Sequence, residues 1–523
     1  MPRRSSFRAF LVLALAVTAV AAVSAGAAPL TSSAPVEISA VDPFAACPPD
    51  GSGTNFPSAE VEPFVGVNPT NAMNIVSVYQ QDRYSNGGSK GTVAAVSTNG
   101  GLTWTNVAVP ADTTCTGGVY SRASDPWISF SPNGTAHVLS LVTDADPATG
   151  GVGDNGMVYN RSTTGGLTWE PPILIAHDEN PRYLNDKNSI TADPNDSNFV
   201  YAVWDRAQDA ARFNAENNPK GLGFKGPINF TRTTDGGTTW EPVRVIYETG
   251  ANKQTIGNQI VVRPTGELFD FFADIVNSSN RRDGIGPVFV SYIKSTNRGE
   301  TWTKPTRVDD QLPMTLFRAS STVDLEAAPC PDPSQTGACP IRGGDLIPDV
   351  AVNRANGNLY AVWQDARFSF FQTGAFQWDS IAYSQSTDGG QTWSPAIQVN
   401  QTPPGSVQNS QAFTPSVHVS ANGTVTVTYF DFRNNTASPA TLDTDYWAVH
   451  CHPASENCAD PASWNEENRI TPASFNIREA AFARGYFLGD YMGLDSTGNT
   501  FVTAFGSTVG GGPSSIFSNK LTP

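Results

Sequence analysis

The sequence predicts an all-β chain, a β-propeller of four-stranded blades, because two patterns repeat along it. One is an eight-residue motif with five copies, at 97–104, 162–169, 233–240, 295–302 and 386–393. The other is a pair of short apolar strands around a turn of the Asn-Gly type, and it occurs seven times. Short strands rich in Val, Tyr, Phe and Trp and bounded by Asn, Gly and Pro are typical of β-meanders. Repeated four-stranded meanders close radially into a propeller.

Each copy of the motif, such as STDGGQTW at 386–393, joins two strands, so we expect a tight hairpin turn there. Its glycines supply the positive φ angles that such turns need. The third residue is expected to accept hydrogen bonds from backbone N–H groups two residues on, and the closing Trp is expected to fill the space between neighbouring sheets. The third residues are Asn99, Thr164, Asp235, Asn297 and Asp388.

The seven strand pairs give the blade count. They cover 62–83, 125–142, 187–206, 258–275, 347–367, 414–433 and 489–506. A degenerate motif at 443–447 is assigned to the sixth blade. After the seventh pair the chain offers only one more strand, at 514–521, and residues 35–40 are expected to supply the missing outer strand. We favour seven blades, with six as the alternative, and interpret 207–226 and 308–346 as loops.

The N-terminus predicts export. Three arginines in the first eight residues precede an apolar run over 10–23 and a stretch of small residues. This order is typical of a secretory signal peptide, so we expect residues 1–27 to be removed and residues 28–523 to form one propeller domain. No second apolar stretch approaches the ~20 residues of a spanning helix.

The chain is acidic, with a formal charge of −16 that becomes −19 when the three arginines leave with the signal peptide. This charge argues against nucleic acid and against an anionic membrane surface as partners. We expect a secreted monomer without a membrane span, whose partner is an extracellular glycan.

Six cysteines in an exported chain predict disulfides. Two pairs are close in sequence, which leaves the remaining two cysteines for each other; the pairs are Cys330/Cys339, Cys451/Cys458 and Cys47/Cys115. The histidines that flank Cys451 raise zinc as an alternative to its disulfide. No cofactor is predicted; calcium is an option in Asp-rich propeller loops, although no EF-hand spacing is present.

The motif, with the form S/T-x-D-x-G-x-T-W, resembles the Asp-box or BNR repeat of sialidases and related propellers across nearly the whole mature chain. The resemblance implies three arginines that bind a substrate carboxylate, a tyrosine nucleophile activated by a glutamate, and an aspartate acid/base. The first family arginine lies in an Arg-Ile-Pro-like motif at the start of the first blade. This chain departs from the family there, because residues 61–65 read VEPFV and hold no arginine.

The motif turns join third and fourth strands, so they all lie on one face of a propeller. The opposite face collects the ends of the second strands and the starts of the first strands, and we expect the site there. Four second strands end in an acid and an arginine, which predicts an arginine cluster for an anionic sugar. The alternative is that each pair pins a loop or bridges adjacent blades. The pairs are Asp82-Arg83, Asp205-Arg206, Asp365-Ala366-Arg367 and Asp431-Phe432-Arg433.

The first strands start with polar residues that differ from blade to blade, as an asymmetric binding site would require. They are Glu62, Asp125, Lys187 with Asn188, Asn258 with Gln259, Asp349, and Asp490 with Tyr491. We assign Tyr491 as the nucleophile, Asp490 or Glu479 as its base and Asp125 as the carboxylate acid, with Lys187 and Asp349 binding substrate. The alternatives are that Tyr491 packs between blades and that Asp125 caps a turn before Pro126.

These observations predict a secreted, sialidase-like glycoside hydrolase, an exo-glycosidase acting on extracellular and anionic glycans. One alternative is a non-catalytic propeller that binds a glycan or a protein. A second is a polysaccharide lyase with a Tyr or His base, for which only His418 lies in a first strand near the rim.

Overall fold

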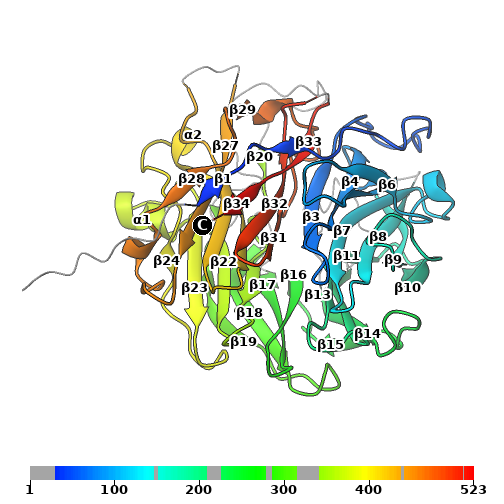
Figure 1. The fold of residues 1–523 in the computed structure, drawn as a ribbon, viewed down its shortest axis with the longest axis horizontal. Helices are drawn as coiled ribbons and strands as arrows, with labels where there is room; N and C mark the ends of the chain where they lie inside the picture. The colour runs from blue at the N-terminus through cyan, green and yellow to red at the C-terminus, as the bar shows by residue number, and fades with distance from the viewer. Residues whose placement is uncertain are drawn as a thin grey trace, which may run out of the picture.

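The computed structural model describes residues 30–146, 151–208, 225–277, 285–314, 341–436, 441–510 and 512–522. These residues form mostly β-strands, as predicted (Figure 1). The signal peptide assigned to 1–27, the Cys330/Cys339 pair and large parts of the two loops lie outside the described residues. Among the described residues, no helix is both long and apolar enough to cross a membrane.

The strands follow one another as antiparallel four-stranded units, each running from a first, innermost strand to a fourth. Every one of the seven predicted strand pairs is present as the first and second strands of a unit. The first three units are β3(Val61–Val67), β4(Ile75–Arg83), β5(Ser89–Ser97) and β6(Thr105–Ala108); β7(Arg122–Phe130), β8(Ala136–Ala145), β9(Val152–Ser162) and β10(Ile173–Asp178); and β11(Tyr183–Ala192), β12(Val200–Gln208), β14(Ile228–Thr233) and β15(Arg244–Tyr247).

Three further units continue the pattern. They are β16(Lys253–Val262), β17(Leu268–Asn277), β18(Ile285–Ser295) and β19(Thr306–Gln311); β21(Asp349–Val352), β22(Leu359–Asp365), β23(Ser380–Ser386) and β24(Ile397–Gln398); and β25(Ala412–Val419), β26(Val425–Asp431), β27(Asp443–Cys451) and β28(Glu467–Arg469). The short helices α1(Arg367–Thr373) and α2(Val407–Ser410) lie in connections of the fifth and sixth units.

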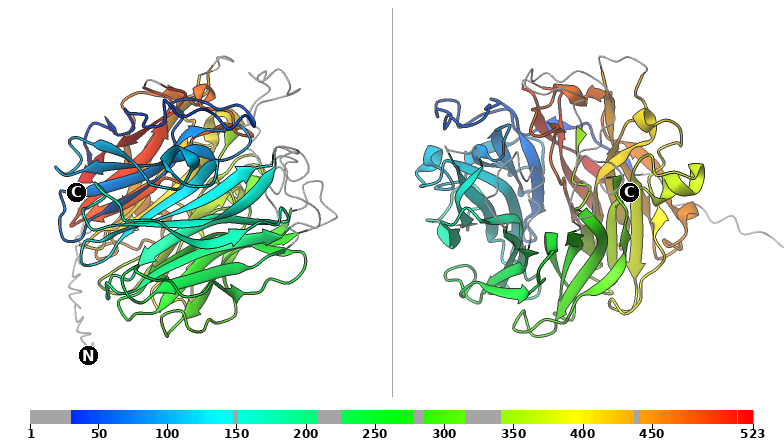
Figure 2. Two further views of the ribbon diagram at one scale, coloured as in Figure 1. Left: turned by 90° about the vertical axis from the view of Figure 1, so that its right-hand side faces the viewer. Right: turned by 180° about the vertical axis from the view of Figure 1, so that it is seen from behind.

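The last unit combines both ends of the chain. Strands β31(Gly493–Thr497), β32(Thr500–Ser507) and β33(Ser515–Ser518) pair in order, and β33 then pairs with β2(Val36–Glu37), as predicted. A second contact between the ends joins β34(Lys520–Thr522) to β1(Thr31–Ser32). The C-terminal strands therefore lie beside N-terminal ones, and Figures 1 and 2 show the red and blue segments together.

Apolar side chains fill the space between neighbouring units. Contacts between first strands run from β3 through β7, β11, β16, β21 and β25 to β31, which in turn contacts β3. The closing Trp of each motif packs into the core between its own unit and the preceding one, as predicted. These residues are Trp104, Trp169, Trp240, Trp302 and Trp393.

The motif turns have one hydrogen-bond pattern. Asp235 Oδ1 accepts from the N–H groups of Thr238 and Thr239, at 3.0 and 2.9 Å, while the Thr233 hydroxyl accepts from Gly237 N at 3.0 Å. The third residue thus binds N–H groups three and four positions ahead, and not two as predicted. Thr164 makes the equivalent bond to Thr168 N at 2.9 Å with its hydroxyl.

The sixth unit lacks the motif. The prediction that residues 443–447 hold a degenerate copy of it is wrong. Residues 443–447 lie inside β27, at the start of the third strand, because the connection to the fourth strand comes later. That connection contains the 3-10 helix η3(Pro461–Trp464). Trp464 is fully buried against Tyr383 of the preceding unit, with ring centroids 4.7 Å apart, and so occupies the place of a motif Trp.

Two predicted disulfides are present, Cys47–Cys115 and Cys451–Cys458. The zinc alternative at Cys451 is therefore wrong, because both sulfur atoms are bonded to each other and neither is a thiolate ligand. Disulfides fit an oxidising compartment.

Candidate functional site

A repeated backbone irregularity positions the candidate site. In five first strands, two residues oppose one residue of the second strand, which defines a β-bulge. The first bulge residue has a left-handed backbone in each case, and it is a glycine only in β16. The residues and φ angles are Glu62 (54°), Asp125 (48°), Lys187 (45°), Gly257 (72°) and Thr414 (49°).

This conformation is costly for a residue with a side chain, by about 1 kcal/mol or more each, and it concentrates at functional sites. In the first three units the strained residues are Glu62, Asp125 and Lys187, all of them charged. Since the bulge occurs at the same register in each unit, it brings these three side chains together at the starts of β3, β7 and β11.

Lys187 is the centre of the resulting cluster. Its Nζ lies 3.0 Å from Glu62 Oε1, 3.2 Å from Asp125 Oδ1 and 2.8 Å from Asp490 Oδ2. Asp490 precedes β31, and its backbone N–H donates to Glu62 Oε1 at 3.3 Å. All four residues are buried, and Lys187 and Asp490 keep the most exposure, at 8 % and 7 %. We call Glu62, Asp125, Lys187 and Asp490 the carboxylate–lysine cluster.

Burial and neighbouring charges separate the protonation states of these acids. Burial, reinforced by the charge of Asp125, raises the pKa of Glu62 to about 8. Burial alone would also raise the pKa of Asp490, but Arg342 and Lys187 outweigh it and hold that pKa well below its usual value. At neutral pH Glu62 therefore carries a proton and Asp490 is ionised.

Three arginines border the cluster. The guanidinium of Arg342 donates to Asp490 Oδ2 at 2.6 Å. Arg342 and Arg83 both lie on the ring of Phe487, with Cζ atoms 4.1 and 5.1 Å from its centroid. Burial and then the charges of Arg342 and Arg83 lower the pKa of Arg484 to about 9. We call Arg83, Arg342 and Arg484 the arginine group.

Arg342 reaches the site through a short parallel pairing. Strand β20(Ile341–Arg342) pairs with β30(Tyr486–Phe487), and Arg342 is directly opposite Phe487. Arg83 ends β4 and is 3 % exposed; its Nε has no hydrogen-bond partner among the residues that the structure describes. The arginine group thus combines a second-strand end with two segments outside the repeated units.

Aromatic rings form the floor of the site. Phe64 and Trp127, each following a cluster residue by two positions, stack with centroids 3.6 Å apart, and Tyr491 packs on Trp127 at 5.2 Å. Below them a cavity of about 630 Å³ continues between the first strands toward the face of the motif turns. The aromatic layer separates this cavity from the carboxylate–lysine cluster.

Tyr491 lies against the cluster as part of this layer. Its hydroxyl donates to the Pro126 carbonyl at 3.3 Å, and Lys187 Nζ is 5.8 Å from its ring centroid. Burial, and then the charges of Glu62 and Asp125, raise the pKa of Tyr491 well above its usual value. The nucleophilic role assigned to Tyr491 stays a prediction.

Three predicted arginines lie apart from the cluster, in local ion pairs. Arg206 binds Asp178 at 2.7 Å rather than Asp205, and its Cζ lies 3.7 Å from the ring centroid of Tyr183. The other two bind the acid of their own sequence pair, Arg367 with Asp365 at 2.8 Å and Arg433 with Asp431 at 2.5 Å. These contacts match the alternative in which the pairs pin loops.

The first pair also differs from the prediction. Asp82 binds Lys90 at 2.8 Å, which leaves Arg83 to the arginine group.

Two further predicted site residues lie away from the cluster. Asp349 lines the large cavity, where it accepts the Val417 N–H at 2.7 Å, and burial raises its pKa to about 7. Glu479 is exposed on η4(Ile477–Glu479), where it accepts a bond from Asn476 at 3.4 Å.

Sequence reasoning missed two features of this site. The sequence identifies Glu62 as the start of a first strand and assigns it no role, although its position before a proline matches that of Asp125. Arg342 carried no local signal, since it follows a long loop and meets Phe487 only in the fold. Among the described residues, no group of three or more His, Cys, Asp or Glu side chains is arranged to hold a metal ion.

Comparisons with known proteins give distant structural likenesses. No protein-family model and no curated protein matches this chain. A protein of unknown function from Dyadobacter fermentans is 14% identical, with 94% of this chain and 99% of that chain covered and a TM-score of 0.44. The Hadza microbial sialidase Hz136 is 13% identical, with coverages of 86% and 74% and a TM-score of 0.44. A Penicillium chrysogenum α-L-arabinanase is 13% identical, with coverages of 93% and 98% and a TM-score of 0.41.

Proposed function

We propose that this protein is a secreted, sialidase-like glycoside hydrolase that cleaves carboxylate-bearing glycans at the carboxylate–lysine cluster. The observation that carries the proposal is the set of three strained, charged bulge residues, Glu62, Asp125 and Lys187, at one register of adjacent units. The left-handed bulge belongs to the repeated unit, but charged residues at that position in three adjacent units, with their side chains in contact, are the arrangement that a preorganised active site requires.

Glycoside hydrolysis needs a carboxylic acid that protonates the leaving oxygen and a second, ionised carboxylate. Glu62 suits the first role, because its pKa of about 8 keeps it protonated at neutral pH. Asp125 is placed for the second role, since its carboxyl lies beside Glu62 and its Oδ1 is 3.2 Å from Lys187 Nζ. Asp490 then fixes Lys187 and Arg342 in place.

The separation of the two carboxyls argues against inversion of configuration. The oxygens of Glu62 and Asp125 that contact Lys187 lie 3.0 and 3.2 Å from Nζ. They are therefore at most about 6 Å apart, which is below the ~6.5–9.5 Å of inverting glycosidases, and the hydrogen bond between the Glu62 and Asp125 side chains holds them closer than the ~5–5.5 Å of retaining ones. In this scheme Asp125 takes the nucleophilic role that the sequence assigned to Tyr491, and Glu62 takes the acid role that it assigned to Asp125. Asp125 bonds to the anomeric carbon as the glycosidic bond breaks and Glu62 protonates the departing oxygen; Glu62 then takes a proton from water, which displaces Asp125 from the sugar.

The arginine group supports an anionic substrate. Burial, and with it the charge of Arg342, lowers the pKa values of Arg83 and Arg484, so a bound carboxylate would stabilise these two guanidiniums. This basic group stands within an acidic chain, so it also gives the substrate a local point of attraction.

The proposal also covers the architecture of the fold and the export of the protein from the cell. The ring of contacts between first strands, and the pairing of β33 with β2, support a closed propeller of seven blades. Two disulfides and the sequence pattern of residues 1–27 support export through a signal peptide.

The test uses the purified mature chain with fluorogenic glycosides of N-acetylneuraminic acid and glucuronic acid, and with a neutral arabinofuranoside. We expect turnover of a carboxylate-bearing glycoside, with the anomeric configuration of the first product retained by NMR. Glu62→Gln should lower kcat by about 10²- to 10⁴-fold. Arg484→Met should mainly raise KM, while Arg298→Met, on an exposed motif turn, should change neither.

Three outcomes would contradict the hydrolase. One is the absence of any turnover, which would favour a binding protein. Another is turnover that survives Glu62→Gln unchanged. The third is an unsaturated, ultraviolet-absorbing product, which would identify a lyase.

A further inference from the structure

A buried glutamine, Gln80, connects the carboxylate–lysine cluster to the arginine group. It lies in β4 and is fully buried. Its Nε2 donates to Glu62 Oε2, and its Oε1 accepts from Arg83 Nη1 at 2.5 Å. The side-chain amide of Gln80 therefore lies between the proposed acid and the one rim arginine that joins the site.

Arg83 fixes the direction of this amide. A guanidinium has N–H donors and no acceptor, so only the carbonyl oxygen of the amide can face it. The amino group of Gln80 must then point at Glu62. Arg83 itself is 3 % exposed, and its Cζ lies 5.1 Å from the ring centroid of Phe487, which keeps the guanidinium in place.

The partners of Glu62 differ in hydrogen-bond character. Among the residues that the structure describes, three donors and one acceptor contact its carboxyl group. Besides Gln80, the donors are Lys187 Nζ at 3.0 Å and the backbone N–H of Asp490 at 3.3 Å, both to Oε1. The acceptor is the carboxyl of Asp125, which is hydrogen-bonded to the Glu62 side chain. A protonated carboxyl group has one O–H to donate, and of these four partners only Asp125 can accept it.

We propose that Gln80 is a positioning residue that directs the proton of Glu62 toward Asp125, and that Arg83 sets this direction through Gln80. Without Arg83 the amide is free to turn its carbonyl oxygen to Glu62, and this second acceptor draws the proton away from Asp125. The direction of the proton follows from the contacts alone, whereas its catalytic meaning rests on the proposed hydrolase.

The direction matters for the proposed reaction. Glu62 has to protonate a glycosidic oxygen while Asp125 bonds to the neighbouring anomeric carbon. A proton that points from Glu62 toward Asp125 lies on the side of the acid where this oxygen must be placed. The oxygen is an acceptor, so it can replace Asp125 as the partner of the proton when Asp125 attacks the sugar.

Gln80 allows a test that changes no charge. The charged and titratable side chains that face Glu62 come from β4, β7 and β11 and from the segments at β20 and before β31. They are Arg83, Asp125, Lys187, Arg342, Asp490 and Tyr491. Because Gln80 is neutral, replacing it alters the hydrogen bonds of Glu62 and leaves all these charges in place.

The next residue in the chain offers a matched control. Gln81 is fully buried as well, and its Nε2 donates to Glu60 Oε1 at 2.6 Å. Burial raises the pKa of Glu60 to about 8, as it does for Glu62. Two neighbouring glutamines thus each donate to one buried acid, and only one of these acids belongs to the carboxylate–lysine cluster.

The experiment uses the mature chain with glutamate labelled by carbon-13 at the side-chain carboxyl, observed by NMR at about pH 6, where both acids keep their protons. Glu62→Gln and Glu60→Gln assign the two resonances. We expect Gln80→Met to move the Glu62 resonance and Gln81→Met to move only that of Glu60. Arg83→Met should also move the Glu62 resonance, and it should add nothing when Gln80→Met is already present.

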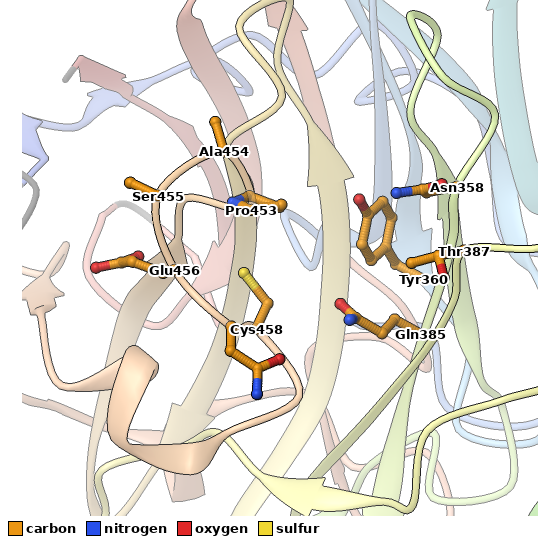
Figure 3. A pocket seen from close by; sticks show the side chains of 10 residues that line it. Asn358, Tyr360, Gln385, Thr387, Pro453, Ala454, Ser455, Glu456 and Cys458 are labelled. Atoms are coloured by element: carbon orange, nitrogen blue, oxygen red, sulfur yellow. The ribbon is translucent and has the colours of Figure 1, made fainter.

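Turnover of a carboxylate-bearing glycoside separates a positioning role from a structural one. Gln80→Met should lower kcat about ten-fold, the effect of one or two hydrogen bonds, and leave KM within about two-fold. Arg83→Met should lower kcat similarly and also raise KM, since it removes a carboxylate-binding arginine. Gln81→Met should change neither value, and nor should Gln385→Met, in the cavity between the fifth and sixth units (Figure 3).

The proposal is overturned if Gln80→Met leaves the Glu62 resonance unchanged, or if Arg83→Met moves that resonance further in the Gln80→Met background. It is also overturned if the chain hydrolyses the glycoside and Gln80→Met keeps the wild-type kcat. If Gln80→Met folds poorly, Arg83→Met decides, and an unchanged Glu62 resonance there is the contradicting result. Absence of turnover in the wild type contradicts the hydrolase alone, because the NMR measurement still tests the direction of the proton.

Discussion

Replacing Glu62 by glutamine should stabilise the protein at alkaline pH while removing its activity. Burial raises the pKa of Glu62 from 4.5 to about 8 in the folded chain. Between these values the folded state keeps a proton that the unfolded chain has released, so stability falls as pH rises. The contribution of Glu62 is fully present below pH 4.5 and is lost as pH passes through about 8. Glutamine resembles the protonated acid and does not titrate.

The size of this change in unfolding free energy follows from the pH range between the two pKa values of Glu62. One pKa unit corresponds to about 1.4 kcal/mol, so the three units between pH 5 and pH 8 correspond to roughly 4 kcal/mol. The unfolding free energy of Glu62→Gln, relative to that of the wild type, should rise by this order between pH 5 and pH 8.5. Glu60, whose pKa burial also raises to about 8, titrates in both proteins and cancels from the difference.

The assay is urea unfolding followed by tryptophan fluorescence at the two pH values. Glu479→Gln is the matched control, because it makes the same chemical change on an exposed residue. If the wild type and Glu62→Gln keep a constant difference in stability across the window, Glu62 is not protonated at neutral pH and cannot be the proposed acid. The same pKa predicts that hydrolysis by the wild type declines above about pH 8.

Other substitutions test the scaffold by urea or thermal unfolding. Asp235→Ala should cost about 1–2 kcal/mol, because it removes the acceptor of the turn's N–H groups, and this loss should fade as pH falls toward 2, where the lowered pKa of Asp235 lies. Thr164→Asp should stabilise its turn by about 0.5–1 kcal/mol, as it restores the carboxylate of other copies. Trp464→Ala should cost about 3–5 kcal/mol, since the indole is fully buried. Arg122→Met should cost about 3 kcal/mol, because it leaves Asp50 without its bidentate partner. An unchanged midpoint in any variant would contradict the contact assigned to it.

The sequence was sufficient for the repeated parts of the fold and insufficient for their exceptions. Strand pairs, motif turns and motif tryptophans follow from local residue patterns, because each unit repeats one solution to the same packing problem. The pairing of 35–40 with 514–521 could also be predicted, since a three-stranded last unit needs an outer strand. The core position of Trp464 could not be predicted, because the loop that carries it does not resemble the motif turns of the other units.

The face of the fold that carries the candidate site could be predicted from the sequence, but the full set of residues that form the site could not. Topology alone placed Asp125, Lys187 and Asp490 on the face opposite the motif turns, and the structure brings them within contact distance. The rim arginines looked equivalent in sequence, yet only Arg83 joins the site, since Asp82 is bound by Lys90. Arg83 joins the site because Lys90 binds the acid that precedes it, and no sequence pattern identifies Lys90 as that partner.

The bulges connect the regular fold to the irregular site. A bulge shifts the first strand so that its extra residue is unpaired and its side chain is redirected. In β16 that residue is Gly257, which adopts the conformation without strain and brings no chemistry. In the first three units the same backbone position holds charged residues whose left-handed conformation is costly, and their side chains meet around Lys187. The backbone irregularity is thus a property of the repeated unit, whereas the charges placed on it are particular to three units. The asymmetry of those charges, in a ring of similar blades, locates the chemistry.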